Sequence, residues 1–168
     1  MPITLNGSGT VSGISVGGLP DGIIQSADIA SGVIPAGGKI LQVVQSHSTA
    51  VYSTTSNSMT EYAALNTTIT PASSSNKILI MVSLSVGSST TAGQGFQLYD
   101  GSTHISAATN SNVSVQTAAT VQIDSTFDTK QPAFQYLYSP STTSATTIKV
   151  YAQADSGTTL YINRYGYS

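Results

Sequence analysis

The sequence predicts an all-β protein, a β-sandwich of jelly-roll character that follows an extended N-terminal arm. Three observations lead to this prediction. Apolar and polar residues alternate in many short segments from residue 39 onward, with the period of half-buried strands. Turn-forming residues separate these segments, and no long stretch has the 3.6-residue period of a helix. Short strands at regular spacing are packed most economically as a two-sheet sandwich.

The first 38 residues are a different kind of segment. They hold nine of the fifteen glycines, with isolated isoleucine and valine residues between them. Only residues 26–30 could make a helical turn, with Ser26 as its cap. Such a segment cannot bury enough surface to order itself. We therefore expect residues 1–38 to be an extended anchoring arm docked on a partner, and residues 39–168 to be the sandwich domain. The expected anchors are the apolar side chains of the arm: Ile14, Val16, Leu19, Ile23, Ile24 and Ile29.

The first half of the domain contains four candidate strands. Residues 40–45 are a short apolar run, and residues 62–69 form a second candidate that ends before Pro71. The clearest candidate is residues 77–86, where Ser83 and Ser85 fall on one face and five aliphatic side chains share the other: Ile78, Ile80, Val82, Leu84 and Val86. Phe96 and Leu98 then alternate with polar residues up to the dipeptide Asp100-Gly101, which is typical of hairpin turns.

The second half of the domain continues the alternation. Its apolar stripes are Val113 and Val115; Val121, Ile123 and Phe127; Phe134, Tyr136 and Tyr138; Ile148, Val150 and Ala152; and Leu160 and Ile162. Threonine is frequent on the polar faces, which suits strands because β-branched residues pack well on a pleated surface. With the first half, these stripes indicate a domain built from short strands throughout.

The charge of the chain excludes several classes of partner. The net charge is −2, and the few basic residues are scattered. This pattern gives no electrostatic footprint for nucleic acid and none for an anionic membrane surface. No apolar run is long enough to span a membrane. We therefore expect no nucleic-acid partner and no membrane insertion. Because the sequence has no cysteine, it can form neither disulfides nor thiolate metal sites.

No arrangement of residues indicates catalysis, so we expect a protein that is not an enzyme and has neither a cofactor nor a metal. The two histidines, His47 and His104, lie in polar segments. Neither a Gly-x-Ser-x-Gly elbow nor a phosphate loop is present. Asp124 and Asp128 could share a strand face as a carboxylate pair for glycan cleavage, but polar residues at a strand end are the simpler interpretation.

Tyrosine is concentrated in the last third of the chain, at Tyr136, Tyr138, Tyr151, Tyr161, Tyr165 and Tyr167. One explanation is packing in the core or between subunits, because tyrosine combines a large area with one polar group. The other is stacking on a host sugar. In that case the expected receptor contacts are Tyr161, Tyr165 and Tyr167.

Four segments of the domain carry recurrent turn and strand-edge motifs: residues 69–82 (ITPASSSNKILIMV), 99–103 (YDGST), 138–147 (YSPSTTSATT) and 158–164 (TTLYINR). Together they resemble small virion surface proteins and fibre-tip domains of tailed phages of aquatic bacteria, cyanophages among them. The resemblance covers about residues 40–168. Relatives often have arginine before the glycine of the second motif, where this chain has Asp100. The resemblance implies a phage particle and a homotrimer, rather than a particular chemistry.

The composition also suggests where the protein acts. Serine and threonine are abundant, as in exposed proteins, yet the N-terminus lacks the basic and apolar regions of a secretion signal. Incorporation into a virus particle released by lysis is the simplest route to the outside. We expect a trimeric protein on the virion surface that decorates or cements the capsid, with its arm bound to other virion proteins and above all to the major capsid protein. The alternative is a short tail fibre or its receptor-binding tip, which contacts a host surface glycan. A polysaccharide-degrading enzyme is disfavoured by the missing carboxylate site.

Overall fold

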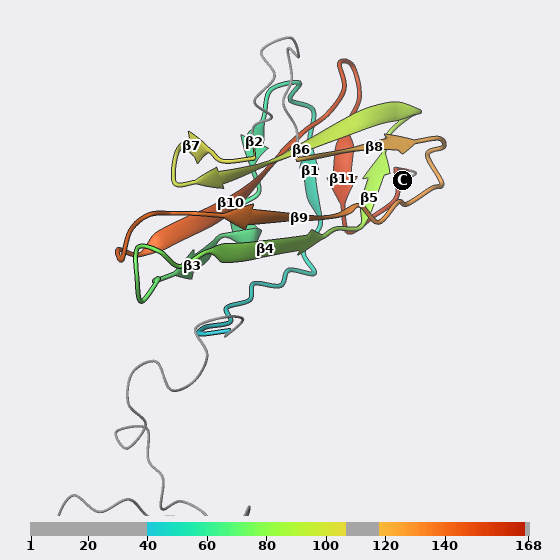
Figure 1. Cartoon of the computed structure of the whole chain (residues 1–168). Helices are drawn as coiled ribbons and strands as arrows, with labels where there is room; N and C mark the ends of the chain where they lie inside the picture. Colours follow the sequence, from blue (N-terminus) through green and yellow to red (C-terminus); the bar gives the residue numbers. More distant parts are fainter. Residues whose placement is uncertain (1–39, 107–117, 167–168) are drawn as a thin grey trace, which may run out of the picture. The chain divides into compact units, whose positions relative to one another are not determined.

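The computed structural model describes residues 40–106 and 118–166, and these residues are almost entirely strands and loops. The chain divides into two units between Val43 and Val44, and every strand among the described residues belongs to the second unit. The strands are β1 (Tyr52–Thr54), β2 (Thr60–Glu61), β3 (Thr67–Ile69), β4 (Ile78–Ser83), β5 (Val86–Ser88), β6 (Ala92–Asp100), β7 (Thr103–His104), β8 (Ala119–Ile123), β9 (Ala133–Tyr138), β10 (Thr146–Gln153) and β11 (Leu160–Ile162) (Figure 1). One short 3-10 helix, η1 (Ala63–Leu65), lies between β2 and β3. The predicted all-β class is confirmed.

The strands pair from the ends of the domain inward. β1 pairs with β11, β2 and β3 pair with β10, β4 pairs with β9, and β6 pairs with β8, always antiparallel. As the chain advances from Tyr52 to Ala92, its pairing partner moves back by a similar number of residues, from Ile162 to Ile123. Successive strand pairs therefore keep nearly the same register. The domain is therefore one long antiparallel ribbon that is folded back on itself and rolled up, which is the jelly-roll arrangement.

The rolled ribbon forms two sheets. What we call the first sheet combines the three-stranded sheet β1–β11–β5 with the separate two-stranded sheet β4–β9, because the two adjoin where β5 follows β4. The junction is held by backbone hydrogen bonds: Val86 and Lys130 exchange two, with N···O distances of 2.8 and 2.9 Å, and the N–H of Leu84 donates to Pro132 O at 3.1 Å. In the second sheet β10 has β2 and β3 on one side and β6 on the other, and β6 also pairs with β7 and β8.

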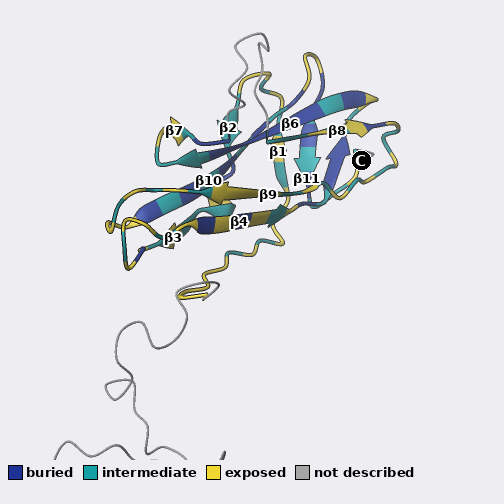
Figure 2. Cartoon of the chain, in the orientation of Figure 1, coloured by how far each residue is buried: buried dark blue, intermediate teal, exposed yellow. Residues whose placement is uncertain are grey.

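The core lies between the two sheets, because each hydrophobic cluster takes side chains from both. One cluster joins Val86 and Leu160 of the first sheet to Phe96 and Ile123 of the second. The other joins residues such as Ile80 to residues on β6 and β10. Burial alternates along β10 at every residue, and Figure 2 shows the dark, buried bands on this strand. Each large aliphatic side chain buried in this way contributes about 1.5–3 kcal/mol.

The hairpin predicted at Asp100-Gly101 is confirmed. β7 turns back on β6 with His104 opposite Tyr99. Gly101 has a φ of +57°, a conformation that suits glycine. Its N–H donates to Thr147 O at 3.0 Å, which anchors the turn to β10.

Three strand predictions are wrong in part. Residues 40–45 form no strand, because an apolar run without a neighbouring strand has nothing to pair with. The segment 62–69 is a strand only from Thr67. The backbone N–H of the buried Tyr62 donates to Val150 O, and the 3-10 helix η1 follows directly and interrupts the strand. Phe127 lies in a turn beyond β8 and is 68% exposed. The residues of the expected arm, together with Val113 and Val115, lie outside the described residues.

Candidate functional site

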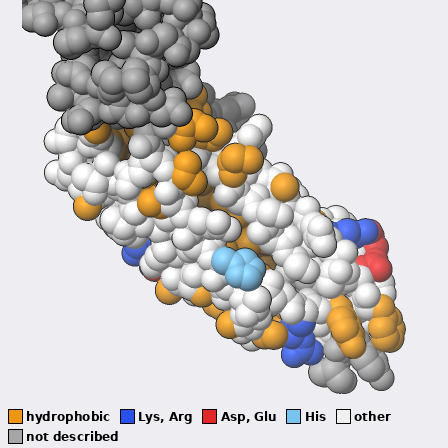
Figure 3. Space-filling model, turned by 90° about the horizontal axis from the view of Figure 1, so that it is seen from below, with side chains coloured by type: hydrophobic (Ala, Val, Ile, Leu, Met, Phe, Trp, Pro, Cys, Tyr) orange, Lys and Arg blue, Asp and Glu red, His pale blue; other side chains and the backbone are white. Residues whose placement is uncertain are grey.

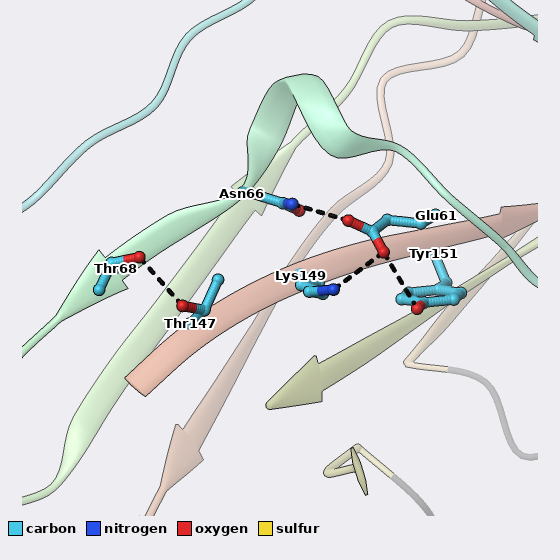
Figure 4. Close-up of polar contacts among 6 residues, drawn as sticks. All are labelled: Glu61, Asn66, Thr68, Thr147, Lys149 and Tyr151. Carbon is cyan, nitrogen blue, oxygen red and sulfur yellow. Dashed lines mark hydrogen bonds and ion pairs between the residues drawn. The ribbon is translucent and has the colours of Figure 1, made fainter. Parts of the chain in front are cut away.

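The outer face of the second sheet carries a polar cluster centred on Glu61 (Figure 4). Its carboxylate accepts hydrogen bonds from Asn66 Nδ2 at 2.7 Å, from Lys149 Nζ at 3.0 Å and from the Tyr151 hydroxyl at 3.2 Å. The side chains of Glu61 and Lys149 are only 28% and 23% exposed. The cluster ties β2 and the turn after it to β10, which is its neighbour in the sheet.

The electrostatics of this cluster favour structure over proton transfer. Hydrogen bonds from Asn66 and then Lys149 lower the pKa of Glu61. The bond to Glu61 raises the pKa of Lys149 in return. Burial, reinforced by the Glu61 charge, raises the pKa of Tyr151. An efficient general acid or base needs a pKa near the working pH, and these shifts move all three groups away from neutrality.

An aromatic stack continues the same face. The ring centroids of Tyr99 and Tyr151 are 4.1 Å apart, and those of Tyr99 and His104 are 5.1 Å apart. The Tyr99 hydroxyl donates to Gln97 Oε1 at 3.0 Å. His104 Nε2 lies 3.1 Å from Ser106 Oγ, and burial lowers the pKa of this histidine. Tyr151 therefore links the two groups, because its ring stacks on Tyr99 and its hydroxyl donates to Glu61.

The outer face of the first sheet is different where β4 meets β9. Leu79, Met81 and Leu137 point away from the core and are 57%, 73% and 56% exposed. Opposed across the two strands are Leu79 and Leu137, Met81 and Gln135, and Ser83 and Ala133. We call these six residues the β4–β9 face. None of them is charged. β9 is also an end strand, since in the part of the chain described here it pairs only with β4.

Figure 2 shows how exposure differs between the strands of the first sheet. In Figure 2, exposed bands alternate with buried ones along β4 and run along β9, whereas β5 and β11 are mostly buried. Figure 3 shows one side of the molecule, on which groups of apolar side chains lie among uncharged polar ones and charged side chains are few.

The chain itself covers the first sheet's outer face at β5. A Cβ atom on Gly87 would stand 2.5 Å from Arg164 O and 2.8 Å from Tyr165 Cα, so the C-terminal backbone lies directly against β5. Asn163, with a φ of +65°, starts this segment. Its Nδ2 donates to the carbonyl oxygens of residues 48 and 50 at 3.0 and 2.9 Å. The Arg164 guanidinium lies 4.5 Å from the centre of the Tyr161 ring.

The predicted site residues are not gathered in one place. Tyr161 is half-buried beneath Arg164, and Tyr165 is 49% exposed. Asp124 follows β8 and pairs with Lys130 Nζ at 3.1 Å. Asp128 lies in the turn beyond, so the two aspartates share no strand face. The expected arm anchors Ile14, Val16, Leu19, Ile23, Ile24 and Ile29, and also Tyr167, lie outside the described residues.

Neither the Glu61 cluster nor the β4–β9 face was predicted from the sequence. The face had a readable signal. In the run Ile-Leu-Ile-Met-Val-Ser the outward positions Leu79 and Met81 are as apolar as the inward ones, which a half-buried strand open to water would avoid. The Glu61 cluster had no such signal, because its Lys149 and Tyr151 partners are 88 and 90 residues away in sequence.

Comparison with known proteins adds no identity. The chain matches no protein-family model, and no curated protein matches it. Over residues 40–106 and 118–166, no three histidine or acidic side chains come together as a metal site would require. Among the same residues no helix has the length and apolar character needed to cross a membrane. The function must therefore be argued from the surfaces of the sandwich.

Proposed function

We propose that this protein is a non-enzymatic structural protein of a tailed-phage particle, a trimer on the virion surface that decorates and cements the capsid and is tethered by residues 1–38. The observation that supports it most is the β4–β9 face. Exposed apolar side chains that gather on one face of a soluble domain mark contacts with other proteins. A rigid sandwich that offers such a face is suited to assembly.

The chemistry of the remaining surface agrees with this role. A cement protein acts by mass action, because binding only to the assembled shell lowers the free energy of that state alone. It needs a stable domain and a tether rather than reactive groups. The Glu61 cluster fits this requirement, since its hydrogen bonds connect β2 to β10 and stabilise the second sheet. The jelly roll is also an architecture found in viral capsid proteins.

A second function, host attachment as a short tail fibre or fibre tip, is favoured by one specific observation. Tyr99, Tyr151 and His104 form an aromatic group beside Lys149 and Glu61 on the second sheet. Aromatic surfaces bordered by a few polar groups are typical of ligand sites. In this role the group would contact a glycan of the host surface. The exposed Tyr165 lies against β5 of the first sheet and is not part of this group.

Particles that lack the protein separate the two functions. A cement protein predicts that such particles assemble but release DNA at lower temperature or lower salt than intact ones, while they adsorb to the host at the normal rate. Nuclease sensitivity after heating and an adsorption assay measure both properties. Full physical stability with lost adsorption would contradict the cement role and support host attachment.

The tether is tested by deletion of residues 1–38. The first of the described strands begins at Tyr52, so we expect the truncated chain to keep its β-sheet circular dichroism. It should no longer load onto particles that lack the protein, whereas the full chain should load to normal occupancy. Normal loading of the truncated chain would contradict the proposed tether.

A further inference from the structure

We infer that the β4–β9 face is the surface through which copies of this chain associate around a three-fold axis. The inference rests on the proposed trimer and adds which strands form its interface. Its occupant is a second copy of the chain, with the edge of β9 in one copy against the β4–β9 face of the next.

The β4–β9 region combines two features that favour contact with another molecule, namely exposed apolar side chains and an open strand edge. Leu79, Met81 and Leu137 each expose more than half of their surface, and removing such area from water is favourable by roughly 25 cal/mol per Å². The adjoining strand β9 ends the sheet, in the described part of the chain. An end strand leaves backbone N–H and C=O groups unpaired, which proteins normally cover or blunt with charge. β9 carries no charged residue.

The charge pattern of the two outer faces favours a second copy of the chain as the occupant. Near a symmetry axis each side chain approaches the same side chain of the other copies, so a charged residue there would face its own charge. All six residues of the β4–β9 face are uncharged. The outer face of the second sheet, in contrast, presents the Glu61–Lys149 pair. The neutral face is the one suited to a symmetric contact between copies.

The geometry of a three-fold assembly also agrees with this region. A closed trimer needs a heterologous contact, in which two different surfaces meet. The β4–β9 region offers both surfaces next to each other, a flat apolar face and an open strand edge. The C-terminal segment already covers the first sheet at Gly87. The contact between copies is therefore confined to the β9 end of the sheet.

The test uses full-length variants and light scattering at micromolar concentration. Met81→Glu and Leu137→Glu place a charge on the β4–β9 face. Thr120→Glu places the same charge at an exposed strand position of the second sheet and is the matched control. We expect a trimer mass for the unmodified chain and for Thr120→Glu, and a monomer mass for both face variants, with unchanged circular dichroism.

A less disruptive variant keeps the test informative if a glutamate variant fails to fold. Met81→Gln keeps the length of the side chain and removes only its apolar character, and we expect it to weaken trimer association at least tenfold. Trimers that persist with unchanged affinity in all three face variants would overturn the inference and leave the trimer itself standing. A monomeric unmodified chain would overturn both the inference and the proposed trimer, whereas a loss of trimer in Thr120→Glu as well would show that the effect is not specific to this face.

Discussion

The two sheets of the sandwich have outer faces of opposite character. On the second sheet, Glu61 and Tyr99 organise their neighbours into an ion pair, hydrogen bonds and stacked rings. On the first sheet, the strand pair β4–β9 exposes leucine and methionine without a charged residue among them. Both faces belong to one rolled ribbon with the same alternation. The difference therefore arises from the outward residues alone. On the second sheet their polar and aromatic groups contact one another, whereas on the first sheet their apolar side chains are exposed.

The first sheet makes the same distinction within itself. Its β5 end is covered by the C-terminal backbone, whereas its β9 end has no cover from the described residues. Gly87 marks the boundary, because any side chain there would meet the backbone of Arg164 and Tyr165. A position can thus be apolar and outward for two reasons, contact with the chain's own tail or contact with another molecule. The variants below test the cover over β5 and the polar contacts of the second sheet.

The largest effect is expected from Gly87→Ala. The added methyl would press on backbone atoms that cannot move away easily, and overpacking of this kind costs about 1–3 kcal/mol. Urea unfolding followed by circular dichroism measures the change. Gly93→Ala is the matched control, since its Cβ would meet only the Gln122 side chain at an ordinary 3.6 Å. Equal stability of the two variants would contradict the assigned cover over β5.

An intermediate effect is expected from Glu61→Ala. The variant removes three hydrogen bonds from one carboxylate and should cost about 1 kcal/mol, as is typical for a partly exposed charged group. Thr68→Val removes only the exposed hydrogen bond to Thr147, shown in Figure 4, and should change stability by less than about 0.5 kcal/mol.

The pH dependence sharpens this prediction. The pKa of Glu61 is lower in the folded state, so its contribution to stability is complete above the unfolded value of about 4.3 and is lost as the pH falls through the folded value. The stability difference between the unmodified chain and Glu61→Ala should therefore shrink below about pH 4. A difference that stays constant down to pH 2 would show that the charge of Glu61 is not the cause.

The smallest effect, visible only in alkali, is expected from Tyr138→Phe. The Tyr138 hydroxyl donates to Asp100 Oδ2 at 2.8 Å, and burial followed by this bond raises the pKa of Tyr138 to about 12. A raised folded pKa means that the contribution of Tyr138 is complete below about pH 10 and is lost between that pH and about 12. The unmodified chain should lose more stability than Tyr138→Phe between pH 9 and 11.5 in urea titrations. Parallel curves would contradict the assigned bond.

The sequence was sufficient for the core but not for the surfaces. Strict alternation in Ile148, Val150 and Ala152 predicted the buried side of β10, and Phe96 and Leu98 did the same for β6. Alternation shows which side of a strand is buried but not what the strand pairs with. The apolar run at residues 40–45 therefore suggested a strand that is absent.

The missed elements have a physical reason of the same kind. β1 and β2 contain only Tyr52–Thr54 and Thr60–Glu61, which is too short for a period to be recognised. They are strands because β11 and β10 supply their hydrogen bonds. The Glu61 cluster depends on the same long-range pairing. The rolled topology decides which distant segments come into contact. The pattern of residues within one short segment does not reveal that topology.

The central claim, that the β4–β9 face meets other copies of this chain, is tested most directly by cross-linking. The chain has no cysteine, so Leu137→Cys introduces one thiol on β9, and Thr120→Cys introduces one on the second sheet as the control. Each protein is treated with a short bis-maleimide at micromolar concentration and separated on a denaturing gel. We predict covalent dimers of the chain for Leu137→Cys and monomers for Thr120→Cys. Only monomers for Leu137→Cys, in a protein that light scattering shows to be trimeric, would contradict the claim.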